Sequence, residues 1–525
     1  GNITGALVDL NGADNVFING INNSGNSLTI SNTNTGTSAI TLRFIADAAG
    51  NTISNCSLLG SGTAVAVGVV VFSTGSLLGN SANAIINCNI GPAGTNLPVN
   101  GILSAGSTGF DNLGNSVMNC NIFDFFSSSL ATAGILVSTN STNWTITGNR
   151  IYQTALRTYG TANTHRGIQV SAGNGHSILN NIIGYGSSAA TGIYAMNSTV
   201  GTRFIAVNLA VGTSVLSSVQ GNTVSAITLT TSSSASTANG IICGVNVTAG
   251  NVDIGGVFSN VIGGTSGTDL IAGSPTAANG MVVGFNSSST GTINILNNYI
   301  GGISSSGTTA AISGGASGIN ISGVATALAI SGNTIGNLSP DNIRGGTNGL
   351  TTAASPVSGI NLPSTSSNTI IISGNTIRNL ASYGTGNGYV RGIWTAASQS
   401  VLSTYSITSN RIANLVSNSG LTTISNGQAG ALGINISTGT NDVVSSNTIS
   451  GVALVGTAAI GCYAAGITLG NATNTSLLKN HIYDITNAGT NAISTAPGIA
   501  AGIVIRSGDF QVNIHNNMIS LGNGS

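Results

Sequence analysis

The chain has 525 residues but only 11 Lys+Arg and 11 Asp+Glu, and its formal net charge is zero. This balance excludes a polybasic surface for nucleic acid or membrane, while a hydrophobic content of 41% argues against disorder. No apolar run approaches the ~20 residues that span a bilayer. A polar but nearly uncharged surface is typical of a chain held in a wall, matrix or assembly.

One hexad recurs along the chain: an aliphatic residue, any two residues, an Asn or Cys, any residue, and a second aliphatic residue. Its copies follow one another at intervals of 29 to 42 residues, which indicates an internal repeat. The fourth position of the hexad is occupied by Asn19, Cys56, Cys88, Cys120, Asn149, Asn181, Asn222, Asn260, Asn298, Asn333, Asn375, Asn410, Asn447, Asn480 and Asn517.

A second marker lies in each repeat, usually a Gly followed by alternating apolar residues. Examples are Gly134-Ile135-Leu136-Val137 and Gly318-Ile319-Asn320-Ile321, and we place the same marker at Gly192, Gly240 and Gly280. Alternation of period two predicts strands, and the abundance of Gly and β-branched residues disfavours helix. Strands that recur in one direction stack on their own copies, so we predict a parallel β-helix.

The fold that we predict is therefore all-β, with about fifteen coils, no significant helix, and one continuous solenoid over residues 1–525. The chain is in repeat register by Asn19 and still so at Asn517, so we expect it to be a segment of a longer polypeptide. We expect the Asn column to form because Asn tolerates the left-handed backbone of a sharp corner and because stacked amides can hydrogen-bond along the column.

These two markers, from Gly5 to Ile519, resemble the right-handed parallel β-helix superfamily of pectate lyases, polygalacturonases, phage tailspikes and bacterial adhesins. The wording Gly-Ile-x-Val and Ile-x-x-Asn-x-Ile is most similar to long, Ser/Thr/Asn-rich surface β-helices of secreted Bacteroidota-type proteins. The resemblance implies a right-handed solenoid and an extracellular or bacterial cell-surface location. It implies no particular ligand.

The enzymes of that superfamily cluster carboxylates on one face, within roughly 5–10 Å of one another. The eleven Asp residues of this chain are dispersed, and we interpret the closest candidates, Asp9 with Asp14 and Asp253 with Asp269, as turn residues. The four histidines show no metal-ligand spacing and are interpreted as isolated surface or core residues: His165, His176, His481 and His515. We therefore predict no catalytic residue, no cofactor and no metal site.

Three cysteines, Cys56, Cys88 and Cys120, replace Asn in the column at two intervals of 32 residues. Stacked coils would bring their Cα atoms to about 4.8 Å, within disulfide range, but side chains in register run parallel and give a poor dihedral angle. We favour three buried free thiols over a disulfide. Cys243 and Cys462 have no obvious partner, and five cysteines do not make a disulfide framework.

The residue two positions after the marker Gly is expected to point outward. A column of amides with exposed aromatic residues could bind sugar, although the coils' own loops could cover it instead. The candidate ligand surface consists of Gln169, Tyr194, Asn320, Asn361, Trp394 and Asn435.

These observations predict an extracellular structural or adhesive β-helix, such as a surface fibre, spacer or matrix component, without catalysis. Its expected partners are further copies of itself or neighbouring surface proteins, and carbohydrate is a further candidate; no nucleic acid and no membrane span are expected. The alternative is a carbohydrate-active enzyme, either a polysaccharide lyase or hydrolase, or a glycan-binding tailspike on the same scaffold.

Overall fold

The computed structural model describes residues 1–21, 28–235, 239–277, 280–363, 369–386, 388–395, 403–420, 430–456, 463–489, 500–506, 508–509 and 511–521. The chain forms two compact units. The first comprises Gly1–Thr228 with Val245–Asp253, and the second comprises Leu229–Gly244 with Ile254–Ser525. The expectation of one continuous solenoid over residues 1–525 stays a prediction.

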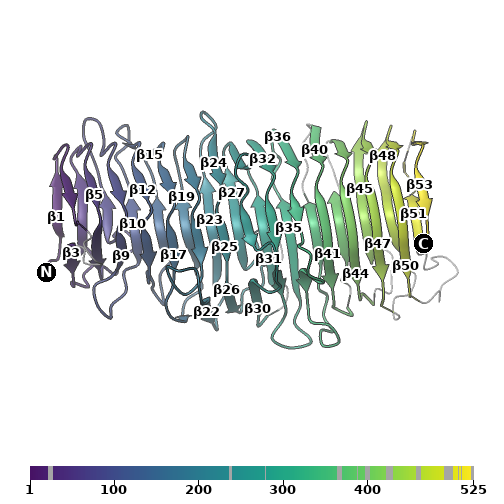
Figure 1. Cartoon of the computed structure of the whole chain (residues 1–525), viewed down its shortest axis with the longest axis horizontal. Helices are drawn as coiled ribbons and strands as arrows, with labels where there is room; N and C mark the ends of the chain where they lie inside the picture. Colours follow the sequence, from purple (N-terminus) through teal and green to yellow (C-terminus); the bar gives the residue numbers. More distant parts are fainter. Residues whose placement is uncertain are drawn as a thin grey trace. The chain divides into compact units, whose positions relative to one another are not determined.

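Each unit is a parallel β-solenoid of the right-handed type, and the described part of the chain contains strands but no helix (Figure 1). Every coil contributes a strand to each of three sheets, and each strand pairs in parallel with its counterpart in the next coil. The predicted fold class is confirmed. Among the described residues there is also no helix long and apolar enough to cross a membrane.

In the first unit the strands of each sheet pair in chain order. The first sheet contains β1 (Ala6–Asn11), β4 (Ile40–Ile45), β7 (Val70–Phe72), β10 (Asn100–Ser104), β14 (Ala133–Val137), β19 (Thr164–Val170) and β23 (Arg203–Ala210). The second contains β2 (Phe17–Asn19), β5 (Thr52–Ser54), β8 (Ala84–Ile86), β12 (Ser116–Met118), β16 (Thr145–Thr147), β20 (Ser177–Leu179) and β24 (Ser217–Gln220). The third contains β3 (Leu28–Asn32), β6 (Cys56–Gly60), β9 (Asn89–Pro92), β13 (Asn121–Phe123), β17 (Arg150–Tyr152), β21 (Ile182–Gly184) and β25 (Thr223–Ser225). Shorter pairs are β11 (Asn112–Leu113) with β15 (Ser141–Thr142), and β18 (Arg157–Tyr159) with β22 (Tyr194–Ser198).

The second unit repeats this arrangement. Its first sheet contains β31 (Gly280–Ser287), β35 (Gly314–Ile321), β39 (Val357–Leu362), β42 (Val390–Thr395), β45 (Ala431–Thr440), β48 (Ala464–Thr473) and β51 (Ala500–Ile505). Its second contains β32 (Thr292–Leu296), β36 (Ala327–Ser331), β40 (Thr369–Ser373), β43 (Thr404–Thr408), β46 (Val443–Ser445), β49 (Ser476–Leu478) and β52 (Asn513–His515). Its third contains β29 (Val261–Gly263), β33 (Tyr299–Gly301), β37 (Thr334–Ile335), β41 (Thr376–Ser382), β44 (Arg411–Ser417), β47 (Thr448–Leu454), β50 (His481–Asn487) and β53 (Met518–Ser520), with β30 (Ile271–Pro275), β34 (Ile303–Ser305) and β38 (Ile343–Gly345) alongside. Residues of β26 (Ile227–Thr231), β27 (Ile242–Ala249) and β28 (Val252–Gly255) belong to both units.

The aliphatic residues of the hexad form the core of both units. Ile330 and Ile335, for example, are fully buried, and each stacks on the equivalent residue of the next coil. Burying a side chain of this size is worth about 1.5–3 kcal/mol, and the contribution repeats in every coil. Val257 and Ile21 are wrong as predicted core residues, because they are 80% and 70% exposed; in the first case the buried Ile254 of β28 lies three residues earlier. Ile514 and Ile519, in the last described coil, are each 45% exposed.

The predicted Asn column forms an asparagine ladder, consisting in the first unit of Asn149, Asn181 and Asn222 and in the second of Asn260, Asn298, Asn333, Asn375, Asn410, Asn447, Asn480 and Asn517. Within each unit, every amide Nδ2 donates to Oδ1 of the next Asn at 2.8–3.0 Å. In a typical rung, the backbone N of Asn333 also donates to Asn375 Oδ1, and Asn333 Nδ2 donates to the carbonyl of Ile295 in the preceding coil. Each rung therefore ties its own coil to both neighbours.

The predicted left-handed corner is displaced by one residue. The positive φ belongs to the residue immediately before the ladder Asn, as in Gly332 (φ 68°) and Asn297 (φ 58°). The ladder Asn itself uses its amide for hydrogen bonds rather than its backbone for the turn. Asn19 is also wrong as a ladder member, because it pairs with Ser54 rather than with Cys56.

Candidate functional site

The predicted ligand surface lies on the first sheet, where strand register decides which residues stack. In the second unit, Asn320 lies beside Asn361, Asn361 beside Trp394, and Trp394 beside Asn435. In the first unit, Gln169 lies between Leu136 and Asn208. The structure therefore brings these residues into an outer column in each unit, and binding of a ligand there stays a prediction.

Tyr194 does not belong to the outer column. It lies on β22, away from the first sheet, and is only 1% exposed against Phe204. The first-sheet strand of that coil is β23, in which Asn208 occupies the column. The Gly192 marker was wrong because a different small residue of the same coil, Ala206, stacks on Gly167 in the first sheet.

The markers at Gly240 and Gly280 are wrong for the same reason. A Cβ added at Gly244 would meet the carbonyl of Gly284, and one added at Gly284 would meet that of Gly318, so these are the stacked glycines. The column residues that follow them are Asn246 and Asn286.

This correction reveals a second set of stacked amides that the sequence analysis missed. Asn246 Nδ2 donates to Asn208 Oδ1 at 2.6 Å in the first unit. In the second unit, Asn320 donates to Asn286 and Asn361 donates to Asn320, each at 2.7 Å. The sequence signal was present, since Asn follows the stacked small residue by two positions in each of these strands, Ala206 before Asn208 and Gly in the others.

Most of the outer column in the second unit is covered. Asn320 and Asn435 are buried, and Trp394 packs beside the buried guanidinium of Arg391. The Arg391 Cζ lies 3.6 Å from the ring centroid of Tyr389 and 4.5 Å from that of Trp394, which is cation–π geometry. Burial lowers the pKa of Arg391. These aromatic side chains therefore hold a cation of the chain itself.

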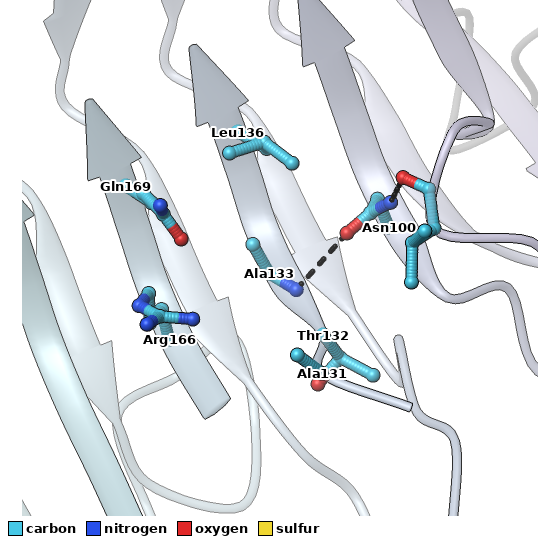
Figure 2. Close-up of a pocket in the computed structure, with 8 residues that line it drawn as sticks. Asn100, Ala131, Thr132, Ala133, Leu136, Arg166 and Gln169 are labelled. Atoms are coloured by element: carbon cyan, nitrogen blue, oxygen red, sulfur yellow. Dashed lines mark hydrogen bonds between the residues drawn. The ribbon is translucent and has the colours of Figure 1, made fainter. Parts of the chain in front are cut away.

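The outer column of the first unit lines a pocket of about 90 Å³. Figure 2 shows Arg166 and Gln169 side by side along β19, with Ala133 and Leu136 on β14 and Asn100 on β10. Asn100 is fully engaged: its Oδ1 accepts from Ala133 N at 3.1 Å, and its Nδ2 donates to the carbonyls of Val65 and Val67. The pocket therefore has a rigid wall and one charged side chain, Arg166.

Carboxylates hold the fold together in both units. Asp9 lies in strand β1 and forms a bidentate ion pair with Arg43, and Asp253 lies in strand β28, so neither is the predicted turn residue. Asp269 does adopt a left-handed turn (φ 54°), and it pairs with Arg344.

Asp47 accepts backbone N–H groups from residues 76–79 at 2.9–3.2 Å. Although desolvation opposes ionisation of this carboxyl, these bonds hold its pKa well below the usual value. Among the residues that the structure describes, no three His, Cys or Asp side chains come together as a metal site.

Two histidines are buried in the first unit, as core residues. His176 accepts from Trp144 N at Nδ1 and bonds the Ala172 carbonyl through Nε2, so the ring is neutral. Burial lowers its pKa to about 4. His165 bonds Thr132 through Nδ1, stacks near Tyr159, and has a pKa lowered by burial to about 3. His481 and His515 are exposed.

Cys56, Cys88 and Cys120 are free and buried, as predicted. Cys243 is also buried, and Cys462 lies outside the described residues. Burial raises the pKa of Cys56 to about 11, and it raises that of Cys120 as well. A hydrogen bond from Cys120 lowers the pKa of Cys88. The backbone N of Cys88 lies 3.4 Å from Cys120 Sγ, so sulfur replaces the ladder oxygen as acceptor in these coils.

No protein-family model and no curated protein sequence matches this chain. Among solved structures, the tailspike protein of Escherichia coli bacteriophage HK620 in complex with a pentasaccharide is 12% identical, with 89% of this chain and 69% of that chain covered and a TM-score of 0.26. A variant of the same tailspike in complex with a hexasaccharide is 11% identical, with 90% and 73% covered and a TM-score of 0.25. Function is therefore argued from this chain's own residues.

Proposed function

We propose that this chain is an extracellular, non-catalytic β-solenoid of the Bacteroidota surface type, acting as a surface fibre, spacer or matrix component. The observation that carries the proposal is the asparagine ladder, which hydrogen-bonds every rung to the coil before and the coil after it. Such a scaffold is stiff, because bending it would break buried amide bonds with no water available to replace them.

The placement of the carboxylates supports a non-catalytic role. Asp9, Asp124 and Asp269 form ion pairs, and Asp47 accepts backbone N–H groups. A carboxylate with these partners is held as a structural anion. General acid-base work requires instead a pair of carboxyl groups facing one substrate.

Assembly is tested by electron microscopy of the native protein at high concentration. Periodic filaments, or particles joined end to end, are the result expected of a fibre or matrix component. Single, separate particles at all concentrations would contradict self-association.

Catalysis is tested by incubating the folded protein with neutral and acidic polysaccharides and measuring new reducing ends and unsaturated products. No product is expected above a heat-denatured control. Product formation that scales with protein concentration would overturn the proposal in favour of a lyase or hydrolase. Retention on an immobilised glycan without product would favour adhesion as the working role.

A further inference from the structure

The pocket on the first unit contains an arginine whose hydrogen bonds are incomplete. Arg166 Nη1 donates to the carbonyl of Thr164 at 2.9 Å, whereas the buried Nε has no hydrogen-bond partner in the described part of the chain. No bond from Nη2 is formed within that part either. A buried charged donor without an acceptor costs free energy, on the order of 1–3 kcal/mol.

The electrostatic surroundings of Arg166 favour an anion. Burial, followed by repulsion from Arg203, lowers the pKa of Arg166, and no carboxylate is among the groups that act on it. Every other side chain that lines the pocket is uncharged: Val65, Asn100, Ala131, Thr132, Ala133, Leu136 and Gln169. The pocket is thus lined by one positive charge, Arg166, a second positive charge acts on it from Arg203 outside the lining, and no lining side chain carries a compensating negative charge.

The shape of the pocket restricts the anion. The planar guanidinium of Arg166 matches the planar oxygens of a carboxylate. Leu136 and Val65 add apolar surface for an attached carbon. The volume of about 90 Å³ admits a carboxyl group with its adjoining carbon.

We propose that the Arg166 pocket binds the carboxylate group of a ligand, with the guanidinium of Arg166 donating to its oxygens and Leu136 contacting the adjoining carbon. The carboxylate can come from a small free acid or from an acidic sugar whose ring remains outside. This binding site goes beyond the scaffold role and does not depend on it.

The test is ligand-detected NMR titration of the folded protein with acetate and with glucuronate, using glucose as the uncharged comparison. Saturable binding of acetate but not of glucuronate identifies a small free acid as the source of the carboxylate. Competitive binding of acetate and glucuronate shows that an acidic sugar can supply the carboxylate equally well. Arg166→Gln is expected to weaken binding roughly tenfold or more, and Arg166→Lys to recover part of it, because Lys keeps the charge but loses the planar edge.

The matched control is Arg411→Gln, which removes an exposed arginine of the second unit and should leave the affinity unchanged. Circular dichroism establishes that each variant is folded. The proposal is overturned if folded wild-type protein binds neither carboxylate, if glucose binds equally well, or if Arg166→Gln binds like wild type.

Discussion

The two units treat the same short strand of the second sheet in opposite ways. In the second unit the amide follows the strand, as in Asn333 and Asn375, and the residue five positions earlier is aliphatic, as in Leu328 and Ile370. In the early coils of the first unit the order is reversed: Asn83 stands five residues before Cys88. The buried amide has moved from one flank of the strand to the other.

The reversed coils contain an upstream ladder formed by Asn51, Asn83 and Asn115. Asn51 Nδ2 donates to Asn83 Oδ1 at 2.8 Å, and Asn83 Nδ2 donates to Asn115 Oδ1 at 3.1 Å. The backbone N atoms of Asn51 and Asn83 each donate to the same oxygen as the side-chain amide of that residue. The comparison teaches that the buried amide of a coil can lie on either flank of this strand, and that the other flank can be apolar, as at Leu328, or polar, as at Asp442.

The largest expected effect comes from removing a rung. Asn333→Leu leaves the backbone N of Asn298 without its acceptor and removes one of the acceptors of Asn298 Nδ2, and we expect a loss of about 3 kcal/mol in local stability. Hydrogen exchange of amides in β32 and β36 measures it. Asn83→Leu in the first unit should cost as much, whereas Thr369→Leu, at an exposed site of β40, should cost little. A negligible effect at both ladders would show that the amides are dispensable.

A change of pH should alter the stability of the two units in opposite directions. In each unit the titrating group lies five residues before a ladder Asn, His176 before Asn181 and Asp442 before Asn447. His176 has a folded pKa of about 4, below its unfolded value, so its contribution is complete above about pH 6.5 and is lost as pH falls toward 4. Asp442 has a pKa raised to about 6 by burial, so its contribution is present at low pH and is lost as pH rises through 6. Each effect is expected to be about 2 kcal/mol.

Hydrogen exchange at pH 7 and at pH 5, corrected for intrinsic rates, separates the two effects. Acidification should decrease protection around β16 and β20 and increase it around β43 and β46. Asp442→Asn should remove the change in the second unit only. The same direction of change in both units would contradict these assignments.

A smaller gain is expected from restoring the downstream amide in a reversed coil. Cys120 Sγ already lies near Cys88 N and the Ile85 carbonyl, which are the partners of a ladder Asn, and Cys120 N already donates to Asn149 Oδ1. Cys120→Asn should therefore extend the ladder by one rung and stabilise the first unit by about 1 kcal/mol. Cys120→Ala is the control and should destabilise it. Chemical denaturation monitored by hydrogen exchange measures both, and equal losses would mean that the pocket of the thiol cannot hold an amide.

The smallest effect is expected at the surface. Arg43 and Asp9 link neighbouring coils, but their side chains are 29% and 33% exposed, so water competes for both. Arg43→Gln should cost about 0.5 kcal/mol or less, with a weaker dependence on salt than in wild type. A cost comparable to that of Asn333→Leu would mean that burial does not decide the strength of contacts between coils.

The hexad was sufficient to predict the solenoid, its aliphatic core and the asparagine ladder, because all three follow from a repeated local pattern. The left-handed residue could have been identified as well, since Gly or Asn precedes the ladder position in coils such as those of Gly332 and Asn297. Tyr194 could not be placed, because Ala206 replaces the marker Gly in the strand that stacks, and only stacking on Gln169 selects Asn208. Arg166 escaped notice because an unsatisfied guanidinium becomes visible only when its neighbours are in position.

The upstream ladder also bears on folding fidelity. A coil that carries the common ladder Asn presents the same side-chain amide to its true neighbour and to the coil two steps away. The ladder alone therefore cannot prevent a coil from being skipped during folding. The coils of Asn51, Asn83 and Asn115 present their amides on the other flank, where a coil such as that of Asn181 offers His176 instead. Mispairing between the two kinds of coil would place an Asn donor against a ring nitrogen or a sulfur in place of an amide oxygen. We therefore expect the exchange of Asn and Cys to favour stacking between coils of the same kind.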